Sequence, residues 1–406
     1  MKIAVKRTPI RVPGFRFAGV RCGLKESGKR DVAVIASDGP AAVAAAFTTN
    51  RVKAAPVVVG LERAPAGRLQ AVVINSGNAN AYTGRDGLAV AREMCAIVAR
   101  ALDINERLVI PSSTGRIGVP LPRGRIRKGV RDACRQLSPD GFHRALEAIM
   151  TTDAFPKFAT DGIVVEDREV TIAGMTKGAG MIAPRMTLPH ATNLTYVMTD
   201  IAASPAALRR VLSVALPQSF NAAVVDGDTS TNDTLVLMAN GFAGNRPLTP
   251  AAPAFPEFCA TVTRILNSLA RLVVKDGEGA TKVIDIRVRG ARTVRDGERV
   301  ADTIARSPLC KAAFFGSDPY AGRIICAMGY SGAVFDPQKV DVYLDDIQIV
   351  RRGQEIVGRV EQRAAAVVSR PEFTLTIHLH AGNAVAYRFT SDLSLEYVRF
   401  NSAYRT

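Results

Sequence analysis

The sequence predicts an α+β fold in which sheets and helices form layers. Two observations support this prediction: short apolar, β-branched runs alternate with amphipathic segments, and strand-like runs dominate after Lys282. The chain has 406 residues, enough for two packed domains or one large one. With 47% hydrophobic and 22% charged residues it has the composition of an ordinary globular protein, so a closed site that excludes water is feasible.

Four elements are predicted in the first half of the chain. Residues 70–75 (QAVVIN) predict a buried strand that runs into an Asn- and Gly-rich loop at 76–84. An amphipathic helix follows this loop and is capped near Asp86. Residues 162–175 alternate around a central acidic pair and predict a hairpin, and residues 193–201 predict a strand.

Two capped helices are predicted in the second half. Ser204 with Pro205 behind it marks a helix start, and residues 258–277 form a second amphipathic helix that ends at a glycine. Gly- and Pro-rich loops within 155–192 predict a break between two structural parts of the chain. No internal repeat occurs. From Lys282 onward the chain is predicted to be mostly strands, at VIDIRVRG (283–290), DVYLDDIQIVRRG (341–353), FTLTIHLHAG (373–382) and LSLEYVRF (393–400).

The net charge of +16 does not by itself indicate a nucleic-acid-binding protein. Lys and Arg are spread along the whole chain, and the densest run, 123–131 (RGRIRKGVR), has no aromatic residue on which a base could stack. The chain also has no Trp. A solvated basic face is therefore the favoured interpretation, and a weak attraction for acidic small substrates is the alternative.

Cysteine and histidine usage predicts no metal site. None of the six cysteines forms a C-x-x-C pair or stands near a His at metal-ligand spacing. His378 and His380 point the same way in a predicted strand, but no acidic or Cys partner stands at suitable spacing, so we interpret them as sheet residues. Buried, reduced thiols and the lack of a signal-peptide pattern predict a cytoplasmic protein. A membrane helix is not predicted, because no stretch reaches about 18 consecutive apolar residues.

Thr192 stands where a Gly-rich, Pro-interrupted loop meets the predicted strand at 193–201. A Thr at the start of a strand is usually structural, because its hydroxyl bonds locally. If the bond between Ala191 and Thr192 were broken, however, Thr192 would have both a hydroxyl and a free α-amine to take its proton. His190, two residues earlier, either influences such a cleavage or is incidental.

Three polar loops have the composition of a binding site. Thr114 and Gly115 lie in a predicted turn whose N–H groups could stabilise an oxyanion, or which is simply a tight turn. The loop at 224–234 starts like a calcium loop but lacks its Gly and Glu, so we interpret it as a polar support for a site. Glu278 stands between two glycines and is either the partner of a ligand amine or an exposed turn. Residues 316–324 predict a loop into a strand.

Several motifs in order resemble the family of glutamate N-acetyltransferase/ornithine acetyltransferase, the bifunctional proteins of arginine biosynthesis. The resemblance covers essentially the whole chain. Each motif alone is weakly diagnostic, and the resemblance rests on all of them occurring in order. The motifs are NSGNANAYTG (75–84), SSTGRIG (112–118), TTDAFPK (151–157), KGAGMIAP (177–184), VDGDTSTNDT (225–234), DGEGATK (276–282), FFGSDPYAGRI (314–324) and EYVRFNSAYRT (396–406).

The resemblance implies an N-terminal-nucleophile type of α+β fold and an acetyl transfer without metal or organic cofactor. A precursor would cut itself between Ala191 and Thr192, giving an α chain of residues 1–191 and a β chain of residues 192–406, assembled as an α2β2 heterotetramer. Thr192 would take acetyl from N-acetylornithine and pass it to glutamate, and acetyl-CoA is a further donor in bifunctional members. The oxyanion pair falls on Thr114 and Gly115. The substrate-binding positions fall on Thr152, Lys177, Thr192, Glu278, Asn401 and Thr406. Thr151 is the alternative to its neighbour Thr152.

One segment departs from the family pattern. After MIAPRM the chain inserts TLPH before Ala191, which makes Thr187 a rival nucleophile and lengthens the loop that would be cut. The Ala before Thr192 and its spacing to Asp200 favour Thr192. Three alternatives stay open: a paralogue with a shifted substrate, a self-processing hydrolase that uses the same threonine, and a non-enzymatic basic binding protein.

Overall fold

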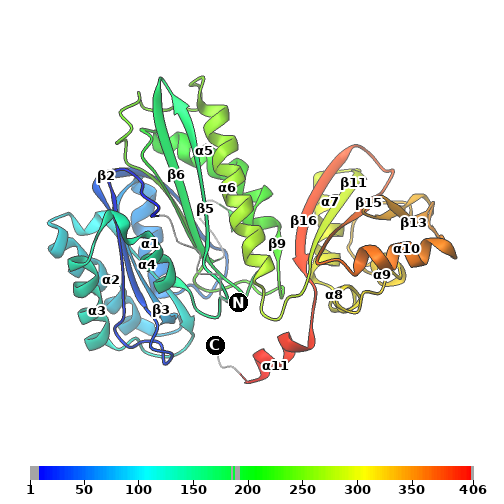
Figure 1. Cartoon of the computed structure of the whole chain (residues 1–406), viewed down its shortest axis with the longest axis horizontal. Helices are drawn as coiled ribbons and strands as arrows, with labels where there is room; N and C mark the ends of the chain where they lie inside the picture. The colour runs from blue at the N-terminus through cyan, green and yellow to red at the C-terminus, as the bar shows by residue number, and fades with distance from the viewer. Residues whose placement is uncertain (1–8, 184–185, 188–192, 404–406) are drawn as a thin grey trace.

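Two sheets covered by helices make up the molecule, so the predicted α+β class is confirmed. The computed structural model describes residues 9–183, 186–187 and 193–403. Figure 1 shows the first sheet and its helices as one lobe and the second sheet as another, with α6 (Phe255–Lys275) at the junction. The chain returns from the second lobe through α11 (Leu395–Ala403), which lies below the junction.

The first sheet joins strands from both sides of Thr192. Its order is β4-β3-β2-β10-β8-β6-β5, with β1 and β7 also paired to β2. The β3–β4 and β8–β10 pairs are parallel, and the other pairs are antiparallel. The strands are β1 (Phe15–Val20), β2 (Val32–Thr48), β3 (Arg68–Asn78), β4 (Val109–Arg116), β5 (Lys157–Val165), β6 (Arg168–Lys177), β7 (Met186–Thr187), β8 (Leu194–Thr199) and β10 (Thr234–Ala239).

Helices cover both faces of this sheet because side chains alternate along its strands. Val34 packs with α2 and α3 on one face, whereas its neighbour Ile35 belongs to the core beneath α4 on the other. Leu237 of β10 packs with α5 and α6. The helices are α1 (Ala55–Arg63), α2 (Gly84–Leu102), α3 (Arg123–Arg135), α4 (Phe142–Ile149), α5 (Pro205–Gln218) and α6, and short 3-10 turns occupy Ala64–Ala66, Glu106–Leu108, Pro139–Gly141, Phe220–Ala222 and Pro337–Lys339.

The second sheet has the order β14-β13-β12-β15-β11-β16-β9. Its core forms where Ile286 of β11 meets Ile304 of α7 and Val367 of α10. The strands are β9 (Ala223–Val224), β11 (Val283–Ala291), β12 (Asp341–Leu344), β13 (Ile347–Arg351), β14 (Gln354–Glu355), β15 (Glu372–His378) and β16 (Ala384–Ser391). The helices are α7 (Val294–Arg306), α8 (Pro308–Phe315), α9 (Gly322–Gly329), α10 (Arg359–Val368) and α11.

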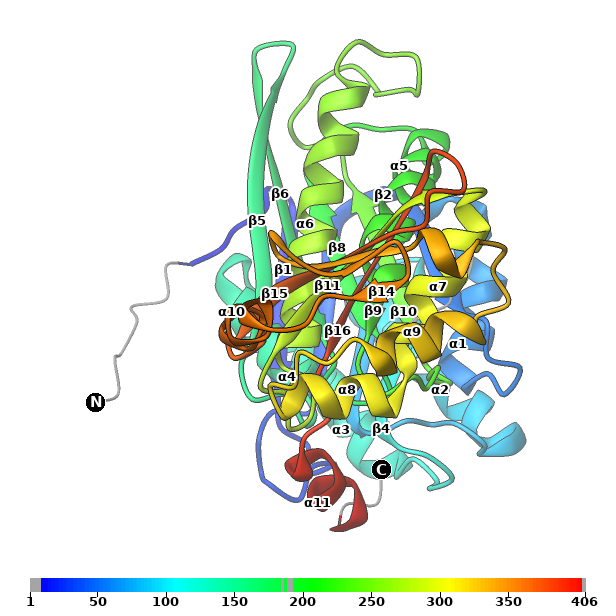
Figure 2. The ribbon, with the colours of Figure 1, turned by 90° about the vertical axis from the view of Figure 1, so that its right-hand side faces the viewer.

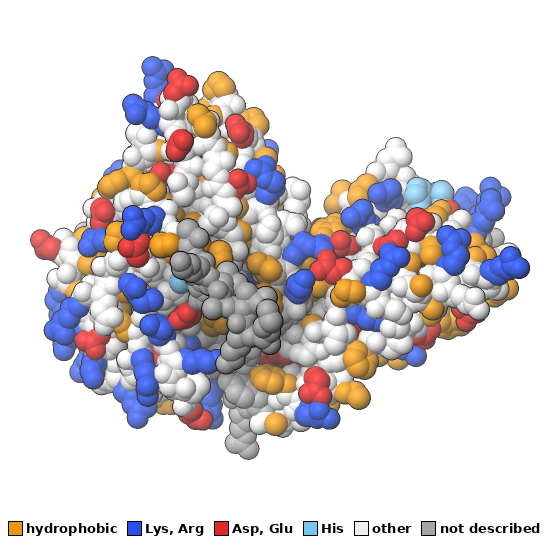
Figure 3. Space-filling view, in the orientation of Figure 1, with side chains coloured by type: hydrophobic (Ala, Val, Ile, Leu, Met, Phe, Trp, Pro, Cys, Tyr) orange, Lys and Arg blue, Asp and Glu red, His pale blue; other side chains and the backbone are white. Residues whose placement is uncertain are grey.

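Most elements predicted before Lys282 are confirmed. The strand at 70–75 lies within β3, and the predicted hairpin at 162–175 is the centre of β5 and β6, which rise as a long ribbon in Figure 2. Ser204 caps α5 by accepting a hydrogen bond of 3.1 Å from the Ala207 N–H. The basic run at 123–131 lies on α3, and Figure 3 shows Lys and Arg scattered over the visible face.

Four predictions are wrong. The chain after Lys282 is not mostly strands, because helices α7 to α11 also lie there. Residues 395–400 of the predicted strand at 393–400 form the first part of α11, and Leu395 is exposed, so the alternation did not mark a buried sheet face. The loop at 316–324 leads into helix α9 instead of a strand. The thiols are all free, but Cys326 is exposed and two others are only partly buried, so they are not uniformly buried. In the described ranges no helix is long and apolar enough to span a membrane.

Candidate active site

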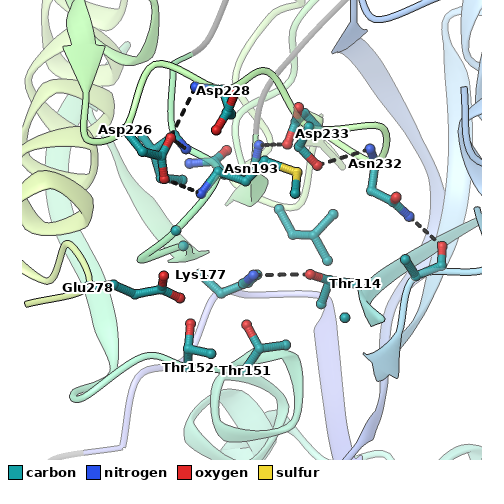
Figure 4. Close-up of a pocket in the computed structure, with 18 of the residues that line it drawn as sticks. Thr114, Thr151, Thr152, Lys177, Asn193, Asp226, Asp228, Asn232, Asp233 and Glu278 are labelled. Carbon is teal, nitrogen blue, oxygen red and sulfur yellow. Dashed lines mark hydrogen bonds between the residues drawn. The ribbon is translucent and has the colours of Figure 1, made fainter. Parts of the chain in front are cut away.

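A cavity of about 230 Å³ lies where the first sheet meets the 226–233 loop and α11. Segments far apart in the sequence contribute to its wall (Figure 4). The structure brings together six residues that the sequence predicted for one site, together with the alternative Thr151. The six are Thr114, Gly115, Thr152, Lys177, Glu278 and Asn401.

Thr114 and Gly115 lie at the end of strand β4 and not in the tight turn that the sequence predicted. They pair in parallel with Ser76 and Gly77 of β3. Gly115 has φ +130°, and a Cβ on it would lie 2.4 Å from the carbonyl carbon of Gly77. Only glycine fits this close approach of two backbones, which leaves the backbone of Thr114 and Gly115 facing the cavity.

Lys177 ends strand β6 and is buried at the bottom of the cavity. Its Nζ donates a hydrogen bond of 3.0 Å to Thr114 Oγ1. Within the part of the chain that the structure describes, it makes no ion pair within 4.0 Å. Burial lowers the pKa of Lys177, and the charge of Asp153 opposes this effect. An ammonium group has three donors, so Lys177 is well placed to receive an anionic ligand.

The 226–233 loop is held against the glycine-rich segment after Lys177. Asp226 accepts hydrogen bonds from the backbone N–H groups of Met181 (2.6 Å) and Ile182 (2.9 Å). Burial raises the pKa of Asp226. Polar residues of the loop predicted at 224–234 therefore line the cavity.

Asp233 is a site residue that sequence analysis missed. It accepts a hydrogen bond from the N–H of Asn193, the residue after Thr192, and Thr234 N–H donates to the Asn193 carbonyl. Its Oδ2 is buried without a hydrogen-bond partner among the described residues, and burial raises its pKa well above the usual value. The parallel pairing of β8 with β10, which places Asp233 beside Asn193, was the missing information.

Glu278 forms the wall opposite Thr114 (Figure 4). The amide of Asn401 donates a hydrogen bond of 3.1 Å to Glu278 Oε2, which brings α11 to the site. A Cβ on Gly180 would lie 2.4 Å from the same oxygen, so a side chain at that position would displace the Glu278 carboxylate. A carboxylate on one side and the Lys177 ammonium on the other give the cavity the charge pattern of an amino-acid binding site.

Beneath the cavity, a buried group of charges joins three segments. Lys157 Nζ lies 2.6 Å from Asp153 Oδ1 and also forms an ion pair with Asp276. The side chains of Lys157 and Asp153 are fully buried, and that of Asp276 is nearly so. Burial opposes ionisation, but Lys157 and Lys177 hold the pKa of Asp153 below its usual range.

Replacing Lys157 by Ala should reduce the free energy of unfolding by about 3–5 kcal/mol, because two carboxylates would remain buried without their cation. Urea titration measures this loss. The matched control is Lys275→Ala, which removes an exposed lysine paired with Glu372 at 3.3 Å and should cost less than about 1 kcal/mol. Equal losses in both variants would contradict the assignment of a stabilising role to the buried pair.

Some predicted positions cannot be placed. Ala191, Thr192, His190 and Thr406 lie outside the described residues, and of Thr187 only the backbone is described, in β7.

The two predicted sheet histidines also differ from expectation. His380 follows the end of β15, and its Nε2 lies 2.8 Å from Asp341 Oδ2, so an acidic partner exists after all. The sequence could not show it because Asp341 belongs to the neighbouring strand β12. The described residues nevertheless contain no group of three or more His, Cys, Asp or Glu arranged to hold a metal.

Known proteins resemble this chain over nearly its whole length. A model of the ArgJ family matches residues 16–406. The arginine biosynthesis bifunctional protein ArgJ of Geobacter sulfurreducens is 48% identical over 395 residues, which are 97% of this chain and 100% of that protein. The protein of the same name from Symbiobacterium thermophilum is also 48% identical, over 97% of both chains. The crystal structure of the argJ protein of Bacillus halodurans is 36% identical, with a TM-score of 0.49 over 50% of this chain and 96% of its own.

Proposed function

Because the chain belongs to the ArgJ family, we propose that it cuts itself before Thr192 and then uses Thr192 to move acetyl from N-acetylornithine to glutamate. Its class is shown by the family: it is an acetyltransferase of arginine biosynthesis that acts on small molecules. This membership removes the alternative of a non-enzymatic basic binding protein. The nucleophile, the cleavage and the roles of single residues are the proposal.

The backbone of Asn193 supports cleavage of the bond before its neighbour Thr192. Asn193 lines the cavity and has φ +99°, a conformation that is strained for a residue with a Cβ. It is held there by the hydrogen bond to Asp233 and by the pairing with Thr234. A chain constrained directly after residue 192 supports the proposal that the bond between Ala191 and Thr192 is broken.

The chemistry then follows covalent catalysis. Thr192 Oγ1 attacks the acetyl carbonyl of N-acetylornithine while the new α-amine takes its proton. Backbone and side-chain groups of Thr114 and Gly115 stabilise the oxyanion. The C–N bond breaks, ornithine leaves with the proton on its nitrogen, and acetyl-Thr192 remains. The amine of glutamate attacks this ester and regenerates Thr192.

Substrate binding uses the opposite charges of the cavity. Lys177 binds a substrate carboxylate, and Glu278 binds the amine of ornithine or its analogue. Thr152 and Asn401, which line the cavity, and Thr406 are the other proposed substrate-binding residues. The observation that carries this proposal is the position of Lys177, hydrogen-bonded to Thr114 and facing Glu278 across one cavity.

No metal or organic cofactor is required in this mechanism, and acetyl-CoA would be an additional donor substrate. We also propose an α2β2 heterotetramer of the two fragments in the cytoplasm, with no nucleic acid or membrane as partner. Size-exclusion chromatography with light scattering would measure the assembly, and a mass of one α and one β chain would contradict it.

The TLPH insertion leaves two alternatives to test: a shifted substrate, and hydrolysis by the same threonine. The proposed function predicts N-acetylglutamate as the product when N-acetylornithine and glutamate are both present. Product analysis by liquid chromatography with mass spectrometry distinguishes the cases. Free acetate at a rate independent of glutamate would indicate hydrolysis, and transfer of acetyl to another amine but not to glutamate would indicate a paralogue.

Glu278→Gln should raise the KM for N-acetylornithine by about 10- to 100-fold, because a hydrogen bond to a charged group contributes about 1.5–3 kcal/mol. The carboxamide keeps the shape and the contact with Asn401 but loses the charge. Steady-state kinetics measures KM, and Glu372→Gln, at an exposed carboxylate of β15, is the control expected to leave KM unchanged. An unaltered KM in Glu278→Gln would contradict the role of its charge.

A further inference from the structure

The buried charges beneath the cavity connect three segments that carry substrate-binding positions. Asp153 Oδ1 accepts a hydrogen bond of 2.8 Å from the Gly178 N–H, and its Oδ2 accepts one of 2.7 Å from the Thr151 N–H. Asp276 accepts hydrogen bonds from the Ala154 N–H and pairs with Lys157. The segment before Lys157, the end of β6 and the end of α6 are thereby fixed to one another.

Asp153 cannot itself bind substrate, because it is buried and both of its oxygens are occupied by protein groups. Asp153 can therefore act on the substrate only indirectly: it accepts a hydrogen bond from the N–H of Gly178, the residue that follows Lys177. Lys177 has only the neutral hydroxyl of Thr114 as a hydrogen-bond partner in the described ranges. A buried ammonium without an ion pair is costly, so its charge depends on carboxylates that act on it from a greater distance.

The charges that act on Lys177 come from several elements. Negative groups favour its ammonium form, and positive groups oppose it. The negative groups are Asp153, Asp233 and Glu278, and the positive groups are Lys157 and Lys25. Of these groups, Asp153 has the largest effect.

We propose that Asp153 is a positioning residue for acetyl transfer, which fixes the backbone after Lys177 and keeps Lys177 a cation for the substrate carboxylate. This inference rests on the proposed function and adds a remote residue that sets the pH range in which glutamate binds. Lys157 pairs with Asp276 as well as with Asp153, so two carboxylates share one cation and the group keeps a negative charge that acts on Lys177.

The sign of the effect follows from this arrangement. Burial lowers the pKa of Lys177 and Asp153 counteracts it, so Asp153→Asn should lower that pKa further. Lys177 would then lose its proton at a lower pH than in the wild type. The KM for glutamate should therefore start to rise at a lower pH in the variant, and should approach the wild-type value on the acid side.

Acetyl transfer from N-acetylornithine to glutamate, measured between pH 6 and pH 9.5, tests this inference. At the alkaline end, the KM for glutamate in Asp153→Asn should exceed the wild-type KM by about tenfold or more. At the acid end the two should agree within about threefold, and kcat should change less than KM. Rates are normalised to the amount of cleaved protein, which a denaturing gel measures.

Two variants separate the charge from the shape of Asp153. Asp153→Glu restores the charge and should move the rise in KM back towards the wild-type pH. Asp161→Asn removes a partly exposed carboxylate of strand β5, paired with Arg264 at 2.9 Å, and should change nothing. A KM raised by the same factor at every pH, or unchanged, would overturn the inference and leave Asp153 a structural residue.

Asp276→Asn keeps the inference testable if Asp153→Asn does not fold. It removes the second partner of Lys157, so more of the Lys157 charge acts on Lys177 and KM should rise at a lower pH, by a smaller factor. The absence of this shift in folded Asp276→Asn would overturn the inference. If the wild-type protein transfers no acetyl to glutamate, the proposed function fails instead, so the two failures are distinguishable.

Discussion

Thr192→Ala should leave the chain in one piece of 43.3 kDa and lower acetyl transfer by at least about 10³-fold. Without the hydroxyl there is neither an attack on the Ala191–Thr192 bond nor an acetyl-enzyme intermediate, so cleavage and turnover are lost together. A denaturing gel after prolonged incubation measures cleavage, and product formation measures transfer. The expected effect is the largest in this account because one group performs both reactions.

Two further variants make this result specific. Thr192→Ser keeps a hydroxyl and should still be cut, at a reduced rate. Thr187→Ala removes the rival nucleophile and should be cut like the wild type. A Thr192→Ala chain that is cut normally, or a Thr187→Ala chain that stays intact, would contradict the assignment.

Gly115→Ala should lower kcat by about 10²–10³-fold, the loss that follows removal of an oxyanion donor. The new Cβ would lie 2.4 Å from the Gly77 carbonyl carbon and 2.5 Å from the Asn78 nitrogen. Because both neighbours are backbone atoms of β3, relief requires the strands to move apart, which displaces the Thr114 and Gly115 backbone. Steady-state kinetics on cleaved protein measures kcat.

Gly118→Ala is the matched control for this substitution. Gly118 also has a positive φ, +78°, but nothing lies within 4 Å of a Cβ built on it. It therefore introduces the backbone strain of a non-glycine residue without the overlap, and should leave kcat within about threefold of the wild type. Equal losses in both variants would show that strain in the loop, and not the close approach of β3 and β4, limits catalysis.

The sequence was sufficient for the residues of the site that occur in local motifs. Thr114 with Gly115, Lys177 and Glu278 each stand in a short stretch rich in Gly, and the structure places them around one cavity. The supporting charges were not predictable in this way. Asp153 and Asp276 meet at Lys157 although 123 positions separate the two carboxylates in the sequence, and the place of Asp233 depends on the pairing of β8 with β10.

The second lobe was predicted less well than the first. Its strands β11 and β15 could be recognised because apolar residues alternate in them, but the helices α7, α8 and α10 were not predicted. The apolar residues of α7, including Val300 and Ile304, recur at helical spacing, but many charged residues separate them. The end of the chain was mistaken for a strand because the exposed apolar residues of α11 imitate alternation.

Intact mass spectrometry of the purified protein, with and without N-acetylornithine, tests the central claim most directly. We expect two chains that meet at Ala191 and Thr192, and a β chain that becomes heavier by one acetyl group when the donor is added without glutamate. Addition of glutamate should then remove that acetyl group. A single uncut chain, a cut at another bond, or an acetyl group on a residue other than Thr192 would contradict the account.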